Sequence, residues 1–426
     1  MPVKKRECFV EIKRDHYLNA LISRMHNGLV KVITGIRRCG KSYLLFTLFY
    51  QYLLEQGVAE DHIFRIELDR RANRQFRDPD VILKHLESCI TDDQSYYYIL
   101  LDEVQMLEEF EEVLNSLLHV KNVDIYVTGS NAKYLSKDVI TEFRGRGDEV
   151  HLLPLSFREF MSVYEGDLYH GWSEYVTYGG LPLTLSMKTK EQKAGYLSGL
   201  FSEVYLPDLA ARYSIAKTRE LEALISILSA AVGQLANPAR LEGVFQSLAH
   251  FSLSGMTIRQ YIGYLEEAYL ISSAHRYDVK ARKLLGTPVK YYFEDVGLRN
   301  ARRKFRQGED AKIMENIVYN ELRCRGYQVD VGVVDIRPRT EDGTQLRRKL
   351  EIDFVANQGS RRYYIQSAFS PDEGKISQEK AALLRVKDSF KKIILVKDVM
   401  NVQRDEDGIV TMSIYDFLLQ ENSLEL

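Results

Sequence analysis

The sequence predicts an α/β protein that begins with a parallel β-sheet covered by helices on both faces. Two observations support this class. Segments that are apolar throughout, such as LVKVITG at 29–35, alternate with segments whose apolar residues recur with the period of a helix. In addition, 426 residues are enough for several domains, at about 100–200 residues each. We therefore expect a parallel-sheet core first and further domains after it.

The elements of this core follow in order along the chain. After the strand at 29–35 comes the helix KSYLLFTLFYQYLLEQG, for which Gly57 is the expected end. The strand IFRIELD, a helix near 80–90, the strand YYYILLDEVQ, a helix near 109–119 and the strand VDIYVTGS complete the alternation. From 173 to 236 the pattern is almost entirely helical, and the later residues mix helices with strands.

The composition is that of an ordinary globular protein, with 45% apolar and 28% charged residues. No apolar run approaches the ~18 residues of a membrane span, and the first residues lack the apolar stretch of a signal peptide. The four cysteines form no CxxC pair, which argues against a zinc site or a disulfide framework. These features predict a cytoplasmic protein with no membrane partner.

Positive charge is concentrated in one part of the chain. The formal net charge is only −2, yet residues 251–350 contain 19 Lys and Arg against 13 Asp and Glu. A nucleic-acid backbone favours such an excess. A solvated surface explains it as well and is, on charge alone, the simpler interpretation.

The segment GIRRCGKS matches the phosphate-binding pattern G-x-x-x-x-G-K-[ST] in full and lies between a predicted strand and a predicted helix. Its glycines let backbone N–H groups turn toward phosphates, and the helix start adds the positive end of its dipole. Lys41 is expected to reach the β- and γ-phosphates, and the Ser42 hydroxyl to bind Mg²⁺. We therefore predict that ATP and Mg²⁺ are bound by Gly35, Ile36, Arg37, Arg38, Cys39, Gly40, Lys41 and Ser42.

Two acidic residues end the strand YYYILLDEVQ. Asp102 is placed to hold the Mg²⁺ shell, and Glu103 to polarise an attacking water. Acidic residues often end strands without a catalytic role, but here they follow a P-loop by one helix-and-strand unit. The adjacent glutamate argues against a small-molecule kinase and predicts hydrolysis of ATP to ADP and phosphate.

Further polar residues are candidates for sensing the γ-phosphate. Ser130 or Asn131 ends the strand that we expect between the P-loop strand and the Asp102 strand, although a simple turn explains them equally well. Arg144 and Arg146 precede the next strand and could complete the ATP site of a neighbouring subunit. That role implies a homo-oligomer. An exposed arginine pair without such a role is an equally good interpretation.

The order of P-loop, DE strand, TGSN, GR and LPLSFREF resembles a family of prokaryotic AAA-type ATPases of the P-loop (ASCE) class. Later segments that match are YGGLP, TIRQYIGYLEEAYLI, YDVKARKLL, KYYFEDVGLRN and ENIVYNELRCRGYQV. In that family an ATPase core is fused to a helical region and a C-terminal domain of unknown function. The resemblance spans nearly the whole chain and implies ATP binding, hydrolysis and a link to DNA.

A winged-helix domain is expected in the central part. The segment NPARLEGVFQSLAHFSLSGMTIRQYIGYLEEAYLI indicates helix, turn, helix, with Thr257 as the cap of the second helix. A strand, a wing and another strand would follow. The residues expected to face DNA are Arg259, Gln260, Lys280, Arg282, Lys283 and Lys290. Winged helices also serve as packing or protein-contact modules, so direct DNA contact and a structural role remain alternatives.

The order of elements after Asp310 matches the core of PD-(D/E)XK nucleases, and Glu315, Glu351, Asp353 and Gln366 are the candidate site residues. Gln366 stands where such enzymes carry a lysine, and Tyr364 stands where a second acidic residue is usual. Because an uncharged amide and a phenol are poor substitutes, the metal site looks incomplete. We expect a restriction-endonuclease-like α/β fold that serves binding or assembly more than cleavage.

The expected organisation has four parts, and three functions compete. The parts are an AAA-type core at 1–165, a helical lid at 166–236, a winged helix at 237–300 and a nuclease-like domain at 301–426. The first function is an ATP-driven switch associated with DNA. The alternatives are an ATP-dependent nuclease and a regulatory scaffold that holds ATP without hydrolysing it.

Overall fold

The computed structural model describes residues 11–91, 95–129, 145–245, 247, 253–306, 308–336, 348–370, 373–398 and 400–426. Contacts divide the chain into two compact units. The first unit comprises Met1–Pro154 and Glu267–Tyr269, and the second comprises Leu155–Glu266 and Leu270–Leu426. None of the helices within the described ranges combines the length and the apolar character needed to cross a membrane.

The first unit contains a five-stranded sheet in the order β2-β3-β4-β1-β5, and every neighbouring pair is parallel. The parallel-sheet core that the sequence predicts is therefore confirmed. The strand β4 lies between β1 and β3, as expected. The strands are β1 (Val30–Thr34), β2 (Ile63–Glu67), β3 (Tyr97–Asp102), β4 (Val123–Thr128) and β5 (Gly147–His151).

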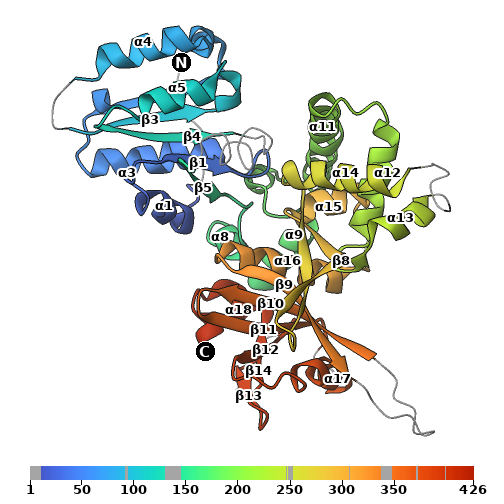
Figure 1. Cartoon of the computed structure of the whole chain (residues 1–426). Helices are drawn as coiled ribbons and strands as arrows, with labels where there is room; N and C mark the ends of the chain where they lie inside the picture. Colours follow the sequence, from blue (N-terminus) through green and yellow to red (C-terminus); the bar gives the residue numbers. More distant parts are fainter. Residues whose placement is uncertain are drawn as a thin grey trace, which may run out of the picture. The chain divides into compact units, whose positions relative to one another are not determined.

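Helices cover both faces of this sheet. In Figure 1, α4 and α5 lie on one face, and α1 and α3 lie on the other. The first face buries the apolar side of α5 against strand residues such as Val32 and Ile99. The helical elements are α1 (Asp15–Ile22), α2 (Lys41–Tyr43), the π-helical η1 (Leu44–Phe49), α3 (Tyr50–Glu55), η2 (Glu60–His62), η3 (Arg71–Arg77), α4 (Pro79–Cys89), η4 (Val104–Met106) and α5 (Phe110–Leu117).

Local signals set the ends of these helices. The Asp78 side chain accepts hydrogen bonds from the backbone N–H groups of Asp80 and Val81 and so caps α4, with Pro79 at the first helical position. Gly57, at φ +83°, follows the end of α3, as predicted.

The second unit begins with helices, in agreement with the helical signal of the sequence. They are α8 (Phe157–Met161), α9 (Leu168–Tyr178), η5 (Pro182–Ser186), α10 (Lys190–Gly199), the π-helical η6 (Leu200–Tyr205), α11 (Leu206–Arg212) and α12 (Thr218–Ala230). Two of them begin at capping boxes, formed by Ser156 with Glu159 and by Thr189 with Gln192.

A nine-stranded sheet in the order β13-β14-β12-β11-β10-β9-β7-β8-β6 runs through the rest of the second unit. Because β7 pairs with β9 in parallel, the strands of 237–300 and of 301–426 share one sheet, which the sequence did not predict. The strands are β6 (Leu235–Ala236), β7 (Ile271–Asp278), β8 (Lys283–Phe293), β9 (Gln328–Ile336), β10 (Arg348–Gln358), β11 (Arg361–Ala368), β12 (Lys391–Val396), β13 (Gln403–Arg404) and β14 (Val410–Ser413).

The helices of this part are α13 (Pro238–Val244), α14 (Gly255–Glu267), α15 (Val296–Arg302), α16 (Asp310–Cys324), α17 (Glu373–Leu383), α18 (Ile414–Leu419) and η8 (Ser423–Glu425). The predicted cap of α14 was wrong by three residues. The Ser254 hydroxyl, and not that of Thr257, accepts the capping hydrogen bond, because the helix already begins at Gly255 and the donor is the Thr257 N–H.

Candidate functional site

The P-loop leaves the carboxyl end of β1 and enters α2, as the motif requires. Gly35 has φ +136°, and a Cβ there would lie 2.2 Å from the Leu152 carbonyl oxygen, so only glycine fits. Gly40 has φ +105°, in the left-handed region, directly before the first helical residue. The two glycines therefore allow the loop to turn tightly between β1 and α2.

Lys41 is the positively charged residue of this loop. Its Nζ donates to the carbonyl oxygens of Gly35, at 2.9 Å, and Ile36, at 3.1 Å. The residue is only 6% exposed. In the part of the chain that the structure describes, its ammonium forms no ion pair with a carboxylate. Its partners are neutral, so its charge is available to an anion in the loop.

Asp102, Ser42 and Thr128 meet beside the loop. Asp102 ends β3 and is buried, and its carboxylate accepts hydrogen bonds from the hydroxyls of Thr128 and Ser42. Burial raises the pKa of Asp102, while these two hydrogen bonds oppose the rise. A serine hydroxyl beside a carboxylate is a pair of oxygen donors that suits Mg²⁺.

Glu103 follows Asp102 in a left-handed conformation, with φ +52°. Its carboxylate accepts a hydrogen bond from the Gln105 side chain. Its backbone N–H donates to the Thr128 hydroxyl oxygen at 3.2 Å. Thr128 thus contacts both acidic residues. The sequence did not predict this role for Thr128, although Thr128 begins the TGSN motif.

A buried arginine holds the P-loop through hydrogen bonds to backbone carbonyls. Arg14 is 2% exposed, and its guanidinium donates to the carbonyl oxygens of Cys39, at 3.1 Å, and Leu153, at 2.7 Å. The Cys39 thiol in turn contacts the Leu152 carbonyl at 3.4 Å. These bonds tie the P-loop to the segment after β5. No sequence pattern pointed to Arg14.

The other expected residues of the first unit are distributed differently. Ser130, Asn131 and Arg144 lie outside the described residues. Arg146 precedes β5, and its carbonyl accepts from the Val30 N–H at the start of β1. It therefore lies at the edge of the sheet opposite to the P-loop. The role of Arg146 in the ATP site of a neighbouring subunit stays a prediction.

The expected DNA-facing residues divide into two groups. Arg259 and Gln260 are exposed near the start of α14, and Lys280, Arg282 and Lys283 are exposed around the turn between β7 and β8. Lys290 is different, because only 2% of it is exposed. The expectation that Lys290 would be available to phosphates was wrong, since carboxylates of the same unit surround it.

Those carboxylates include three of the four candidate nuclease-like residues. The Nζ of Lys290 on β8 lies 2.9 Å from Glu315 on α16, 2.7 Å from Glu351 and 3.6 Å from Asp353, both on β10. We call these four residues the Lys290 cluster. The fourth candidate, Gln366, adjoins it, and its side-chain oxygen accepts from the Asp353 N–H at 2.5 Å. The structure thus brings the predicted residues together and adds a lysine that the sequence had not connected with them.

Burial and charge act together on the protons of this cluster. Burial raises the pKa of Glu315 to about 7, although Lys290 opposes the rise. Burial alone would lower the pKa of Lys290, but the carboxylates of Glu315, Asp353 and Glu351 raise it above its usual value. Among the described residues, no group of three or more His, Cys, Asp or Glu side chains is arranged to hold a metal ion.

Some family motifs in the second unit have a structural role. The Asp295 carboxylate accepts from the backbone N–H groups of Gly180, at 2.8 Å, and Leu298, at 2.9 Å. A Cβ on Gly297 would lie 2.1 Å from the Tyr178 carbonyl oxygen. The segments YGGLP and FEDVGLRN therefore pack against each other, and their glycines allow the close approach.

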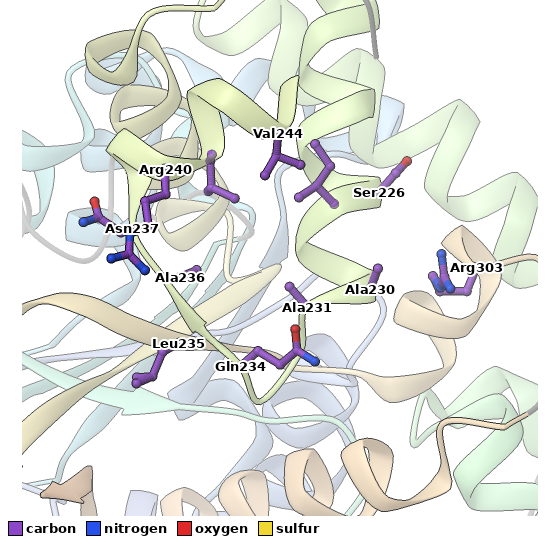
Figure 2. A pocket seen from close by; sticks show the side chains of 12 residues that line it. Ser226, Ala230, Ala231, Gln234, Leu235, Ala236, Asn237, Arg240, Val244 and Arg303 are labelled. Carbon is purple, nitrogen blue, oxygen red and sulfur yellow. The ribbon is translucent and has the colours of Figure 1, made fainter. Parts of the chain in front are cut away.

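A pocket of about 480 Å³ lies between α12, β6 and α13 (Figure 2). Its walls are mainly apolar. Figure 2 shows Arg303 on one side, and Asn237 and Arg240 on the other. Arg303 is paired with Glu309 at 3.5 Å. No residue of this pocket was predicted as a site.

Comparison with known proteins matches both units. A family model described as an AAA domain matches residues 27–161, and one described as a domain of unknown function (DUF8612) matches residues 169–309. An uncharacterized protein of Haemophilus influenzae is 34% identical over 414 residues, which cover 96% of this chain and 99% of that protein.

More distant similarities include an uncharacterized protein of Methanocaldococcus jannaschii, 26% identical over 359 residues, which cover 81% of this chain and 75% of that protein. A Walker-type ATPase of Pyrococcus abyssi is a solved structure with a TM-score of 0.49 and 15% identity, and the match covers 69% of this chain and 96% of that one.

Proposed function

This chain belongs to the same family as the uncharacterized Haemophilus influenzae protein, and its residues 27–161 match an AAA domain; we propose that its first unit binds and hydrolyses ATP. One observation carries the proposal. A buried lysine with neutral partners lies in a glycine-containing loop, next to a group of oxygen donors at the ends of adjacent strands. An anion with an attached cation satisfies both halves of this site.

Each residue has a distinct task in this proposal. Lys41 exchanges its two carbonyl partners for phosphate oxygens, which gains charge-assisted hydrogen bonds without breaking an ion pair. Ser42 and Asp102 are the residues that would hold Mg²⁺, whose charge offsets that of the phosphates. Glu103 orients and polarises the attacking water once Gln105 releases its carboxylate.

The decisive test is a comparison of the intact protein with Glu103→Gln. Calorimetry with ATP and Mg²⁺ is expected to give similar affinities for the two proteins, because the glutamine keeps the shape of Glu103 and removes only its charge. Phosphate release is expected to fall by at least about 100-fold, the usual weight of a positioned base. Equal turnover in both proteins would refute the role of Glu103. Binding without turnover in the intact protein would instead favour the non-hydrolysing scaffold.

The second unit supports a second part of the proposal, namely DNA contact. The elements α12, β6, α13, α14, β7 and β8 follow one another, and β8 pairs with both β6 and β7. We propose that these elements form a winged helix, which would present Arg259 and Gln260 on its recognition helix. The wing would carry Lys280, Arg282 and Lys283. We propose the ATP-driven switch on DNA ahead of the ATP-dependent nuclease, because three of the candidate nuclease-like side chains pair with Lys290.

This part is tested by neutralising the wing. The triple variant Lys280→Ala, Arg282→Ala, Lys283→Ala should bind duplex DNA more weakly and with a salt-dependence slope smaller by up to about 3, one unit for each lost phosphate contact. The control is a triple variant at three other exposed lysines, Lys84→Ala, Lys121→Ala, Lys188→Ala. Equal slopes for the two triple variants would remove the wing from the DNA interface.

A trans-acting arginine is a further proposal and requires an oligomer. Arg146, or Arg144, would complete the site of the neighbouring subunit. Mixing inactive Lys41→Ala with inactive Arg146→Ala protein should then restore part of the turnover, because some interfaces regain one intact site. No recovery in a mixture shown to contain hetero-oligomers would exclude Arg146.

A further inference from the structure

The Lys290 cluster has the form of a cation site whose cation is part of the chain. Oxygens of Glu315, Glu351 and Asp353 lie 2.9, 2.7 and 3.6 Å from one Nζ atom. They come from α16 and β10, whereas the lysine comes from β8. The Lys290 side chain is 3% exposed, so its ammonium is enclosed by the protein.

The carboxylates around this ammonium are oriented by other groups of the second unit. One Asp353 oxygen accepts from the Ser367 N–H at 2.9 Å, and the Glu315 carboxylate accepts from the Tyr292 hydroxyl at 2.7 Å. A Cβ on Gly233 would lie within 2.9 Å of a Glu315 oxygen, so that side is also closed. Glu315 and Asp353 therefore have further partners without an added ligand, whereas Glu351 pairs with Lys290 and is 38% exposed.

Gln366 completes the network on the remaining side. It accepts from the Asp353 N–H and donates to the Glu379 carboxylate. An amide can do both at once, whereas a lysine at this position could only donate. An amide at position 366 therefore fits this network better than a second lysine would.

We propose that Lys290 is the resident cation of this cluster and occupies the place that a divalent metal takes in a carboxylate site. The second unit then recruits neither Mg²⁺ nor Mn²⁺ there. The cluster instead joins β8, and with it the β7–β8 hairpin, to α16 and β10. An ATP-dependent nuclease would then lack its metal ion, and the carboxylates instead form ion pairs that connect these elements.

Titration with Mn²⁺ tests this assignment. The full chain is used without nucleotide and in an Asp102→Asn background, which silences the first unit. In the background protein, electron paramagnetic resonance should detect no Mn²⁺ binding that is lost on Asp353→Asn substitution. Adding Lys290→Met should create one site per chain. This variant should bind Mn²⁺ at least about 10-fold more tightly than the background protein does, because the carboxylates lose their cation. A further Asp353→Asn substitution should abolish that site.

Two outcomes would overturn the assignment. One is Mn²⁺ binding by the background protein that Asp353→Asn removes. The other is a folded Lys290→Met protein, verified by circular dichroism, that gains no site. If Lys290→Met does not fold without metal, refolding with Mn²⁺ should restore it. If it folds under neither condition, the comparison of the background protein with and without Asp353→Asn decides alone.

Discussion

The two units each bury a lysine in a polar centre, and the partners of the two lysines differ. Lys41 is 6% exposed and donates to two backbone carbonyls. Lys290 is 2% exposed and lies among three carboxylates. The comparison teaches that the charge of a buried lysine's partners, more than its burial or residue type, separates a binding site from a structural contact. An unbalanced ammonium attracts an anion, and a balanced one holds its own structure together.

The largest expected effect comes from truncating the balanced lysine. Lys290→Ala should lower the free energy of unfolding by about 3–5 kcal/mol, because it leaves carboxylates buried without their cation. Denaturant unfolding measures this change. ATP affinity of the folded fraction should be unaltered. A loss below about 1 kcal/mol would mean that water already compensates the carboxylates.

Truncation of Lys41, whose partners are neutral, should affect ATP binding more than stability. Lys41→Ala is expected to weaken ATP binding by at least about 100-fold, or about 2.7 kcal/mol, and to change stability little, because only neutral carbonyls lose a partner. Calorimetry and denaturant unfolding provide the two readouts. Lys84→Ala, on the exposed face of α4, is the control. A stability loss as large as that of Lys290→Ala would contradict the distinction between a lysine that binds a ligand and one that stabilises the fold.

Thr128 forms hydrogen bonds with both acidic residues, so its hydroxyl should matter for turnover more than for affinity. Thr128→Val should reduce phosphate release by about 10–100-fold, the size of effect expected when a positioning hydrogen bond is lost. Thr128→Ser should recover most of it, because the hydroxyl remains. If valine and serine variants behave alike, packing at the end of β4 is the property that counts.

The Lys290 cluster should also make stability depend on pH. Burial raises the pKa of Glu315 to about 7, above its ordinary value of 4.5. The folded protein therefore binds this proton more tightly than the unfolded chain does. The corresponding stability is fully present below pH 4.5 and is lost as the pH rises through about 7. Glu315→Gln should flatten the unfolding free energy between pH 5 and pH 8, whereas an unchanged profile would assign the proton elsewhere.

The smallest effect is expected at the solvent side of the same cluster. The Glu351 side chain is 38% exposed, so water can replace much of what it provides. Glu351→Gln should cost only about 0–1 kcal/mol in unfolding experiments, because Glu315 and Asp353 still balance Lys290. A cost near that of Lys290→Ala would show that all three carboxylates are needed.

The contrast between the two centres also explains what could be predicted. The P-loop and the DE pair are contiguous motifs at strand ends, so pattern and periodicity located them, and the structure brings Ser42 and Asp102 together. Arg14 contacts the loop through the Cys39 carbonyl, and Thr128 contacts the two acidic residues from a neighbouring strand. Many sequences could provide such contacts, so no local pattern marks them.

The amino-acid sequence by itself determined the parallel α/β core, the phosphate loop and the order of helices and strands, because these depend on short-range periodicity and on glycine conformations. The tertiary structure alone decided which lysine is free to bind and which is neutralised. Lys290 meets Glu315, Glu351 and Asp353 only after β8, α16 and β10 have packed together. Electrostatic balance depends on distances across the fold, and those distances exist only in the folded chain.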